Sequence, residues 1–253
     1  MDRTESGATR DSRRPGNDAR REAEGPGAPP RGRLLDLWNT LVFTDHSPNP
    51  IVVIAAAFGL TGPEGTRVIE RGIMTRPLQG ISSALDRLAA VTGRRLDGRA
   101  RRDMVVQWGS ACNLNRTYPD VLPTLRRLST GARRPRLGVL SNTQSFDLEC
   151  LRRDGLDLMM DTIRLSCHTG LLKPDPAAFL DAAAHLALPP DRILMVGDRP
   201  GDDVEGAIRA GMRAVLLDRT GSAPPDVGVQ VIRTLADLPP MFSGARPSGG
   251  GAP

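Results

Sequence analysis

Lysine is almost absent from this chain of 253 residues. Of its 34 lysine and arginine residues, only Lys173 is a lysine. Such a bias indicates that most surface positions accept either cation, so a lysine that remains is of interest. Lysine and arginine differ most where a compact ammonium group must lie close to an oxyanion in a tight site. Lys173 is therefore a candidate functional residue.

Aromatic residues are also scarce, at 3% of the chain, and this weakens the nucleic-acid interpretation that a net charge of +5 invites. Single-stranded nucleic acids bind where aromatic side chains stack on the bases beside a basic groove. The densest basic segment, 94–102, is more typical of a solvated helix face than of such a groove. We expect no nucleic-acid partner.

Cysteines and long apolar runs are few. The three cysteines, Cys112, Cys150 and Cys167, lack the spacing of disulfide pairs or metal sites. The longest apolar run, 51–60, is well short of the roughly 20 residues that span a bilayer. The charged N-terminal segment contains no apolar core of a signal peptide. These features predict a cytoplasmic protein without a membrane partner.

The composition divides the chain into a folded middle and two tails. Segments 1–32 and 243–253 are rich in charged residues, glycine and proline and have little to bury, so we expect them to be disordered. The folded part is expected to consist of a core, 33–44 and 119–242, and a small helical domain, 45–118, inserted after the first strand. We expect the inserted domain to cover the active site as a cap.

Short apolar strands alternate with amphipathic helices beyond residue 118. We expect strands over 136–140, 162–165, 192–196, 214–217 and 229–232, and helices over 121–129, 146–154, 177–186 and 202–210. Two further helices are expected in the inserted segment, over 81–91 and 99–108. The alternation predicts an α/β fold, a doubly wound parallel sheet with helices on its faces.

Three of the expected strands end in chemically useful side chains. Asp36 follows the apolar pair at 34–35, Ser141 follows the expected strand 136–140, and Asp198 follows the expected strand 192–196 and Gly197. Ligands of such sheets bind outside the carboxyl ends of the strands. We therefore expect these side chains to meet in one crevice, with Lys173 reaching it from the loop 170–176.

Asp198 and Asp203 would add two carboxylates to that of Asp36, and three carboxylates repel one another unless a cation joins them. Ligands that are all oxygen atoms, without clustered histidine or cysteine, favour Mg²⁺ over zinc. Ser141 would add a hydrogen-bond donor and Lys173 a positive charge. These groups together are typical of phosphoryl transfer through an aspartyl-phosphate.

Four segments of the chain, in this order, resemble the four motifs of the haloacid dehalogenase (HAD) superfamily. The segments are 36–41, 140–142, 170–176 and 196–207, and the likeness extends over about 33–238. The resemblance is to the branch of that superfamily in which a helical (C1-type) cap follows the first motif. It implies a Rossmann-like core and a Mg²⁺-dependent hydrolase, most often a phosphatase.

The resemblance also implies a metal site. Asp36 would attack phosphorus and bind Mg²⁺. The backbone carbonyl of Trp38 and the carboxylates of Asp198 and Asp203 would complete the protein ligands.

The same resemblance implies a phosphate site. Ser141 and the backbone amide of Asn142 would hold the phosphoryl oxygens, and Lys173 would neutralise their charge. Thr40 would steady the turn of the first motif beside the phosphate. The implied partner is a small phosphorylated metabolite, and the protein is expected to be a monomer or a homodimer.

Trp38 departs from the family pattern, since family phosphatases have an aspartate there that acts as general acid and base. Such help contributes about 10²–10⁴ in rate, and tryptophan cannot supply it. A phosphatase could still act on a leaving group that is stable as an anion, or take the proton from the substrate, Asp45 or His46. The alternatives are a hydrolase of carbon–halogen bonds, since halide leaves without a proton, and a non-catalytic phosphate-binding or interaction protein.

Overall fold

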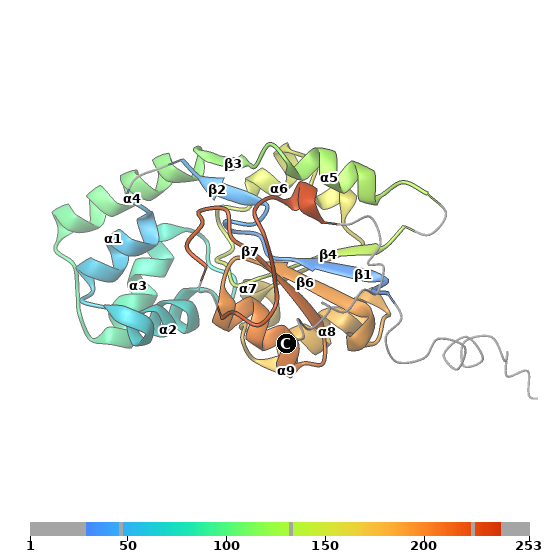
Figure 1. Cartoon of the computed structure of the whole chain (residues 1–253). Coiled ribbons are helices and arrows are strands. Elements are labelled where there is room, and N and C mark those ends of the chain that lie inside the picture. The colour runs from blue at the N-terminus through green and yellow to red at the C-terminus, as the bar shows by residue number, and fades with distance from the viewer. Residues whose placement is uncertain (1–28, 46–47, 132–133, 224–225, 239–253) are drawn as a thin grey trace, which may run out of the picture. The chain divides into compact units, whose positions relative to one another are not determined.

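The computed structural model describes residues 29–45, 48–131, 134–223 and 226–238, which are coloured in Figure 1. Apart from 29–32, the tails predicted at 1–32 and 243–253 lie outside these residues. The first strand begins at Gly32, one residue before the predicted start of the core. Among the described helices, none is both long and apolar enough to cross a membrane.

The core of the fold is a sheet of six parallel strands in the order β5-β4-β1-β6-β7-β8. The strands are β1 (Gly32–Leu35), β4 (Arg136–Ser141), β5 (Thr162–Leu165), β6 (Ile193–Gly197), β7 (Arg213–Leu217) and β8 (Gln230–Ile232). The chain enters in the middle with β1, extends the sheet to one side, and then returns to extend it to the other. The point where the order reverses lies beside β1, where ligands of such sheets bind.

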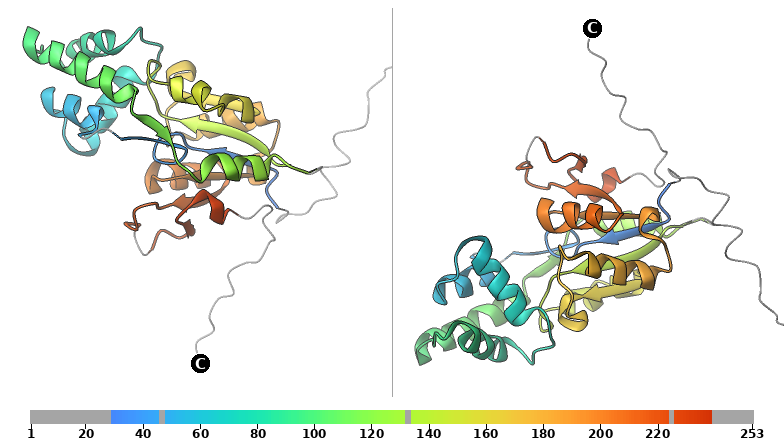
Figure 2. Two further views of the ribbon diagram at one scale, coloured as in Figure 1. Left: turned by 90° about the horizontal axis from the view of Figure 1, so that it is seen from above. Right: turned by 90° about the horizontal axis from the view of Figure 1, so that it is seen from below.

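Helices cover both faces of this sheet (Figures 1 and 2). On one face lie α5 (Val121–Leu128) and α6 (Glu149–Arg153), and on the other α8 (Pro176–Leu186) and α9 (Gly206–Arg209). Shorter elements are the 3₁₀ turns η1 (Asp157–Met159), η2 (Pro190–Arg192) and η4 (Leu235–Asp237), the helix α7 (Ser166–Thr169) and the π-helical turn η3 (Pro200–Glu205). The doubly wound α/β prediction is confirmed.

Neighbouring residues of one strand pack on opposite faces of the sheet. Leu35 and Val196 belong to the cluster beneath α5, whereas Leu34 and Met195 belong to the cluster beneath α8. All four side chains are at most 1% exposed. Since both faces are covered, the strands are continuous apolar runs rather than alternating ones, which is why the sequence pattern identified them.

Two of the predicted helices differ from those in the structure. The helix expected over 146–154 is shorter, because 143–148 form an irregular loop before α6. The helix expected over 202–210 is divided into η3 and α9. In η3 the Asp203 carboxylate accepts from the backbone N–H of Arg199 at 3.0 Å, and no side chain at Gly197 obstructs its approach.

The segment between β1 and α5 contains a two-stranded antiparallel ribbon and four helices. The ribbon pairs β2 (Val42–Thr44) with β3 (Asn115–Thr117), which the sequence analysis did not anticipate. The helices are α1 (Pro50–Ala57), α2 (Gly62–Ile73), α3 (Ile81–Thr92) and α4 (Gly98–Cys112). They bury an apolar cluster of their own, which includes Phe58, Leu88 and Trp108.

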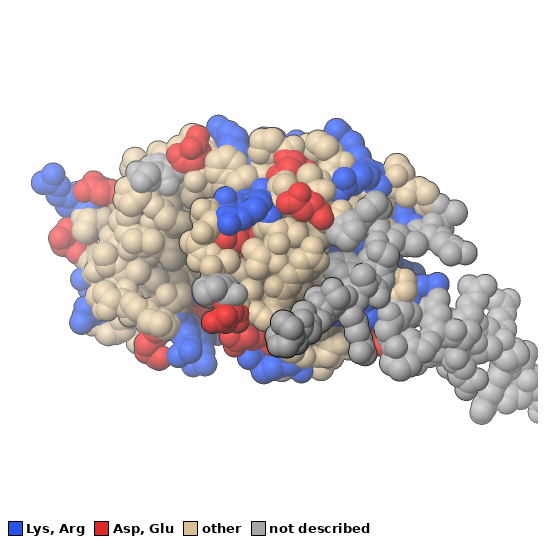
Figure 3. Space-filling model, viewed as in Figure 1, with Lys and Arg blue, Asp and Glu red and all other residues tan. Residues whose placement is uncertain are grey.

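Cationic and anionic side chains alternate on the face of the molecule drawn in Figure 3. Several of the described cations have acidic partners in the structure. Examples are Arg101 with Asp86 at 2.6 Å and Arg134 with Asp161 at 3.1 Å. The net positive charge of the chain thus does not form one continuous basic patch on this face.

Candidate active site

The carboxyl ends of the central strands bring together residues that are far apart in the chain. Asp36 directly follows β1, and its backbone N–H donates to the carbonyl of Val196 in β6 at 2.9 Å. Ser141 is the last residue of β4, and Asp198 directly follows β6. Asp203 lies in η3, immediately beyond that strand end.

Lys173 is at the centre of this group. Its Nζ donates to Asp36 Oδ1 at 2.6 Å and to Asp203 Oδ1 at 2.5 Å. The lysine is 3% exposed, Asp36 is 5% exposed and Asp203 is fully buried. Breaking a buried ion pair leaves an uncompensated charge, so such a cluster tolerates little change in the shape of the cation. This explains why a lysine remains here in a chain that otherwise uses arginine.

Asn142 fixes the backbone at Lys173. Its side-chain amide donates to the carbonyl of Lys173 at 2.9 Å, and its side-chain oxygen accepts from the Lys173 N–H at 2.8 Å. The Asn142 side chain is thereby used in positioning the lysine. Any contact of Asn142 with a phosphate would fall to its backbone amide.

The cluster has an excess of negative charge, and the ionisation of its members reflects this. Burial raises the pKa of Asp36 to about 7; Lys173 opposes the shift, and the carboxylates of Asp203 and Asp198 add to it. Burial and Asp203 likewise raise the pKa of Asp198 to about 6. Burial alone would lower the pKa of Lys173, but the two carboxylates outweigh it and raise that pKa above its usual range. Lys173 is therefore a fixed positive charge at any physiological pH.

The three carboxylates have the composition and spacing of a site for a hard cation. One oxygen from each of Asp36, Asp198 and Asp203 lies within 4.8 Å of the others. Asp198 Oδ1 is buried and has no hydrogen-bond partner among the described residues. Oxygen ligands of this kind suit Mg²⁺. The residues thus fit the metal that the sequence resemblance implies.

The model of one protein family, the haloacid dehalogenase-like hydrolases, matches residues 31–211. The chain belongs to this family. The match includes the strands β1, β4, β5 and β6 and all of the carboxylates above. The HAD resemblance drawn from the four motifs is therefore confirmed, and the protein is a hydrolase.

Several curated relatives of this HAD-like chain carry phosphatase names. A phosphatase of Mycobacterium tuberculosis is 30% identical over 187 residues, which cover 72% of this chain and 79% of that protein. A glyceraldehyde 3-phosphate phosphatase of Methanopyrus kandleri is 38% identical over 103 residues, 40% of this chain and 43% of that protein. A phosphoserine phosphatase of Thermus thermophilus is 35% identical over 130 residues, 50% of this chain and 51% of that protein. The chain thus matches only about half of the length of the last two.

Solved structures show that the fold is shared with HAD enzymes of two kinds. A HAD phosphatase from Thermococcus onnurineus has a TM-score of 0.55 at 21% identity, over 81% of this chain and 94% of that one. A 2-haloacid dehalogenase from Pseudomonas syringae pv. Tomato has a TM-score of 0.54 at 24% identity, over 82% and 95%. At these identities the likeness establishes the fold and does not separate the two chemistries.

The first HAD motif forms a tight turn that directs Trp38 and Asn39 toward the cavity. Asn39 has a left-handed backbone conformation, with φ of 57°, and its N–H donates to the carbonyl of Val42 at 2.6 Å. The Trp38 indole Nε1 donates to Thr143 Oγ1 at 2.9 Å. Because the only polar atom of its side chain has a partner, the Trp38 indole is fixed in place and lines the cavity.

Asn39 is a site residue that the sequence analysis missed. Its side-chain amide donates to Asp198 Oδ2 at 3.3 Å, and this hydrogen bond opposes the rise in the pKa of Asp198. The feature of the sequence that could have identified Asn39 is its position in the motif turn. Asparagine tolerates the left-handed conformation there better than most residues.

Ser141 and Thr40, both predicted to bind phosphate, are buried at the edge of the site. Ser141 is 1% exposed and Thr40 is fully buried. Neither side-chain oxygen has a hydrogen-bond partner among the described residues. The backbone carbonyl of Thr40 accepts from Arg219 Nη2 at 2.8 Å, which ties the motif turn to the loop after β7.

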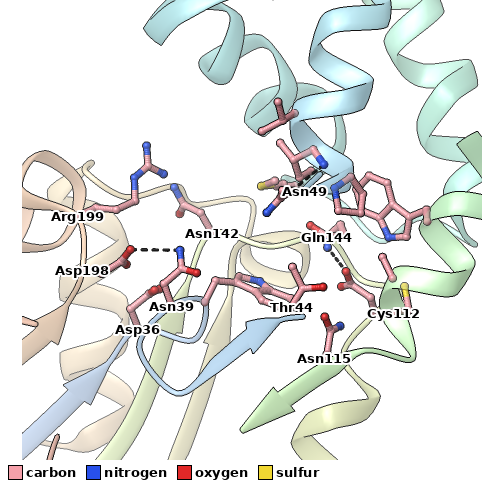
Figure 4. Close-up of a pocket in the computed structure, with 18 of the residues that line it drawn as sticks. Asp36, Asn39, Thr44, Asn49, Cys112, Asn115, Asn142, Gln144, Asp198 and Arg199 are labelled. Carbon is pink, nitrogen blue, oxygen red and sulfur yellow. Dashed lines mark hydrogen bonds between the residues drawn. The ribbon is translucent and has the colours of Figure 1, made fainter. Parts of the chain in front are cut away.

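A cavity opens from this cluster and extends under the inserted segment (Figure 4). Asp36, Asn39, Asp198 and Arg199 lie together at one side in Figure 4, and Thr44, Cys112, Asn115 and Gln144 lie at the other. We refer to these as the motif end and the insert end of the cavity. Asp45, one of the residues considered as a proton donor, is exposed and does not line the cavity, and His46 lies outside the described residues.

Asp147 lines the cavity and was not found from the sequence. It is 9% exposed, and its Oδ2 accepts from Gln144 Nε2 at 2.5 Å. Burial raises its pKa to about 7, although the hydrogen bond from Gln144 and the nearby Trp108 indole act in the opposite direction. An aspartate in the irregular loop after Ser141 and Asn142 gives no pattern in the sequence, so only the fold reveals its position.

Arg199 links the core to the inserted helices. Its guanidinium contacts Glu70 of α2 at 3.1 Å and Asp202 of η3 at 2.7 Å. Glu70 is 8% exposed, and Arg199 lines the cavity together with Asp202. This contact brings a positive charge to the motif end in addition to Lys173.

Proposed function

We propose that this protein is a Mg²⁺-dependent phosphatase that transfers the phosphoryl group of a small phosphorylated metabolite first to Asp36 and then to water. The observation that carries the proposal is the buried pairing of Lys173 with Asp36 and Asp203 at one end of a cavity. The phosphatase names of the relatives in Mycobacterium tuberculosis, Methanopyrus kandleri and Thermus thermophilus support this chemistry.

Asp36, Asp198 and Asp203 would hold the Mg²⁺ ion, together with the backbone carbonyl of Trp38. The spacing of the three carboxylates and the unpartnered Oδ1 of Asp198 support this assignment. When bound, Mg²⁺ supplies positive charge that offsets the carboxylates and the charge of the phosphoryl group.

Asp36 is the nucleophile in this proposal. One of its carboxylate oxygens forms a bond to phosphorus while the bond from phosphorus to the leaving oxygen breaks, which leaves an aspartyl-phosphate. Water then attacks that phosphorus and the bond from phosphorus to the Asp36 oxygen breaks. The released phosphate carries the protons of the water, and the Asp36 carboxylate is restored. Lys173, fixed by Asn142 and paired with Asp36 at 2.6 Å, stabilises the negative charge that the phosphoryl oxygens carry.

Ser141 and the backbone amide of Asn142 are proposed to hold the phosphoryl oxygens. The Ser141 hydroxyl has no partner among the described residues and is therefore free to donate. Thr40 would keep the motif turn in place beside them, a role that its burial and the Arg219 contact to its carbonyl support.

Trp38 restricts the leaving groups that this site can expel. Its indole is hydrogen-bonded to Thr143 and offers neither an acid nor a base. Asn39 is an amide and cannot replace the missing carboxyl group. We therefore propose that the leaving oxygen is stable as an anion, as in an acyl phosphate, or receives its proton from the substrate.

One observation favours a second candidate, a hydrolase of carbon–halogen bonds. Trp38 places an aromatic ring where a phosphatase has its acid, and halide needs no proton to leave. The pair Asp198 and Asp203, which suits a metal, favours the phosphatase instead. A protein that binds phosphate without turnover is the third possibility to test.

The deciding experiment measures phosphate release by the full-length protein from a panel of acyl phosphates and phosphate esters, with Mg²⁺ and with EDTA. We expect Mg²⁺-dependent release that Asp36→Asn abolishes and that Asp45→Asn, an exposed acid nearby, leaves within about twofold. Halide release from 2-haloacids without metal would replace the phosphatase by the second candidate. Binding of inorganic phosphate without turnover of any compound would support the third.

A further inference from the structure

Polar atoms without partners gather at the insert end of the cavity. Thr44 Oγ1, Asn115 Nδ2 and Asp147 Oδ1 are buried and have no hydrogen-bond partner among the described residues. All three residues line the cavity. Burying a polar atom without a partner is unfavourable, and most buried polar atoms in proteins have one. Three such atoms around one space indicate a ligand that supplies their partners.

The fold holds these atoms in fixed positions. Thr44 and Asn115 are directly opposite each other in the antiparallel pair of β2 and β3. Opposite residues of such a pair project to the same face, with neighbouring side chains. Figure 4 shows both beside Gln144, whose amide holds Oδ2 of Asp147 and leaves Oδ1 for another donor. None of these residues belongs to the four HAD motifs.

The charges along the cavity restrict what can bind at this end. The cationic side chains among its lining residues are Lys173 and Arg199, and Arg199 lies at the motif end with Asp36 in Figure 4. At the insert end the ionisable group with a free oxygen is the acid Asp147. A carboxylate or second phosphate would meet no cation there and would be repelled by Asp147 when it is ionised.

The three atoms together require both a donor and an acceptor from the ligand. Asn115 Nδ2 can only donate, ionised Asp147 can only accept, and the Thr44 hydroxyl can do either. A hydroxyl group also does both, so adjacent hydroxyl groups on a short carbon chain satisfy all three. Apolar side chains such as Met74 and Trp108 also line the cavity and suit a carbon chain.

We propose that Thr44, Asn115 and Asp147 form a subsite for an uncharged, hydroxyl-bearing carbon chain, the part of the substrate remote from the phosphoryl group. This inference rests on the proposed function, because the phosphoryl group at Asp36 sets the direction in which the substrate lies. It names the substrate class as small phosphates, acyl phosphates included, whose remote carbon chain carries hydroxyl groups, and it excludes compounds with an anionic tail.

Binding to the full-length Asp36→Asn protein with Mg²⁺ tests the subsite without turnover. The probes are glycerol 3-phosphate, propyl phosphate, 3-phosphoglycerate and inorganic phosphate. Calorimetry gives the affinities. Fluorescence gives a second reading, because Trp38 and Trp108, the two tryptophans of the chain, both line the cavity.

We expect glycerol 3-phosphate to bind at least about tenfold more tightly than propyl phosphate, which lacks the hydroxyl groups. The variants Asn115→Leu and Thr44→Val should remove this preference, while Thr44→Ser should keep it. The control Asn113→Ala, at an exposed position two residues from Asn115, should also keep it. 3-Phosphoglycerate should bind most weakly of the esters and should gain affinity in Asp147→Asn.

Equal affinities for glycerol 3-phosphate and propyl phosphate, with inorganic phosphate still bound, would overturn the subsite and leave the proposed function intact. Failure to bind inorganic phosphate or any ester would overturn both. If Asn115→Leu does not fold, the pair Thr44→Val and Thr44→Ser decides the matter, since the first keeps the shape of the side chain without its hydroxyl and the second keeps the hydroxyl without its methyl group. Tight binding of 3-phosphoglycerate would contradict the exclusion of anionic tails.

Discussion

The two ends of the cavity differ in the ion pairs and hydrogen bonds that already join their side chains. At the motif end, Lys173 pairs with Asp36 and Asp203, and Asn39 donates to Asp198. At the insert end, three buried polar atoms have no partner among the described residues. The motif end also has polar atoms without partners, Asp198 Oδ1 and Ser141 Oγ, but these belong to the proposed metal and phosphate sites. The motif end is therefore organised for one chemical step, whereas the insert end depends on the rest of the substrate to complete it. Such a division separates the chemistry from the choice of substrate.

Lys173→Met breaks the motif end and should have the largest effect on stability. It leaves the buried carboxylates of Asp36 and Asp203 without their cation, and loss of one member of a buried ion pair costs about 3–5 kcal/mol. Phosphate release should also fall by at least about a hundredfold. Urea denaturation and steady-state kinetics measure the two effects.

The matched control for Lys173→Met is Arg164→Met. Arg164 pairs with Asp181 at 2.6 Å, but both side chains are 24% exposed. Loss of a partly exposed pair should cost only about 1 kcal/mol. Equal losses in the two variants would contradict the account of a buried charge cluster that requires its lysine.

The motif end of the cavity could be predicted from the sequence, whereas the insert end could not. Asp36, Ser141 and Asp198 follow continuous apolar strands, and the carboxyl ends of parallel strands meet at one edge, so their convergence was predictable. The pairing of Thr44 with Asn115 joins residues 71 positions apart and depends on the register of a three-residue ribbon. Nothing in the local pattern indicates such a register.

Two further features could not be predicted from the sequence, the hydrogen bond of Trp38 and the backbone conformation of η3. The loss of an acid at Trp38 is visible in the sequence, but its hydrogen bond to Thr143 requires the fold. The helix pattern at 202–210 suggested regular α-helix. The backbone there forms a π-helical turn that places Asp203 against Lys173, and turns of this kind are frequent at functional sites.

Asp147→Asn tests the insert end through the pH dependence of the free energy of unfolding. The pKa of Asp147 is raised to about 7 by burial, so in the folded state it binds a proton that the unfolded chain has lost above about pH 4. The free energy of unfolding should therefore fall as pH rises between these values. The slope attributable to Asp147 is at most about 1.4 kcal/mol per pH unit.

In Asp147→Asn this contribution is absent, so the variant should gain stability relative to the wild type from pH 4.5 to pH 7 and no further above it. Urea denaturation at several pH values gives the difference directly. Parallel curves for the two proteins would show that Asp147 ionises in the folded state as it does in the unfolded chain.

Glu70→Gln should have the smallest effect. Glu70 contacts Arg199 at 3.1 Å, but the Arg199 side chain is 50% exposed, and water weakens such a pair. The variant should lose less than about 1 kcal/mol of stability. A loss as large as that of Lys173→Met, measured by the same denaturation, would mean that the link between α2 and the core is part of the buried charge cluster.

The central claim is that Asp36 performs phosphoryl transfer without an acid at position 38. It is tested most directly by the ratio of kcat/KM for an acyl phosphate to kcat/KM for an alkyl phosphate, in the wild type and in Trp38→Asp. We predict a large ratio in the wild type, and in the variant a gain of about 10²–10⁴ on the alkyl phosphate with little change on the acyl phosphate. Equal turnover of the two compounds by the wild type, with no gain in Trp38→Asp, would contradict it.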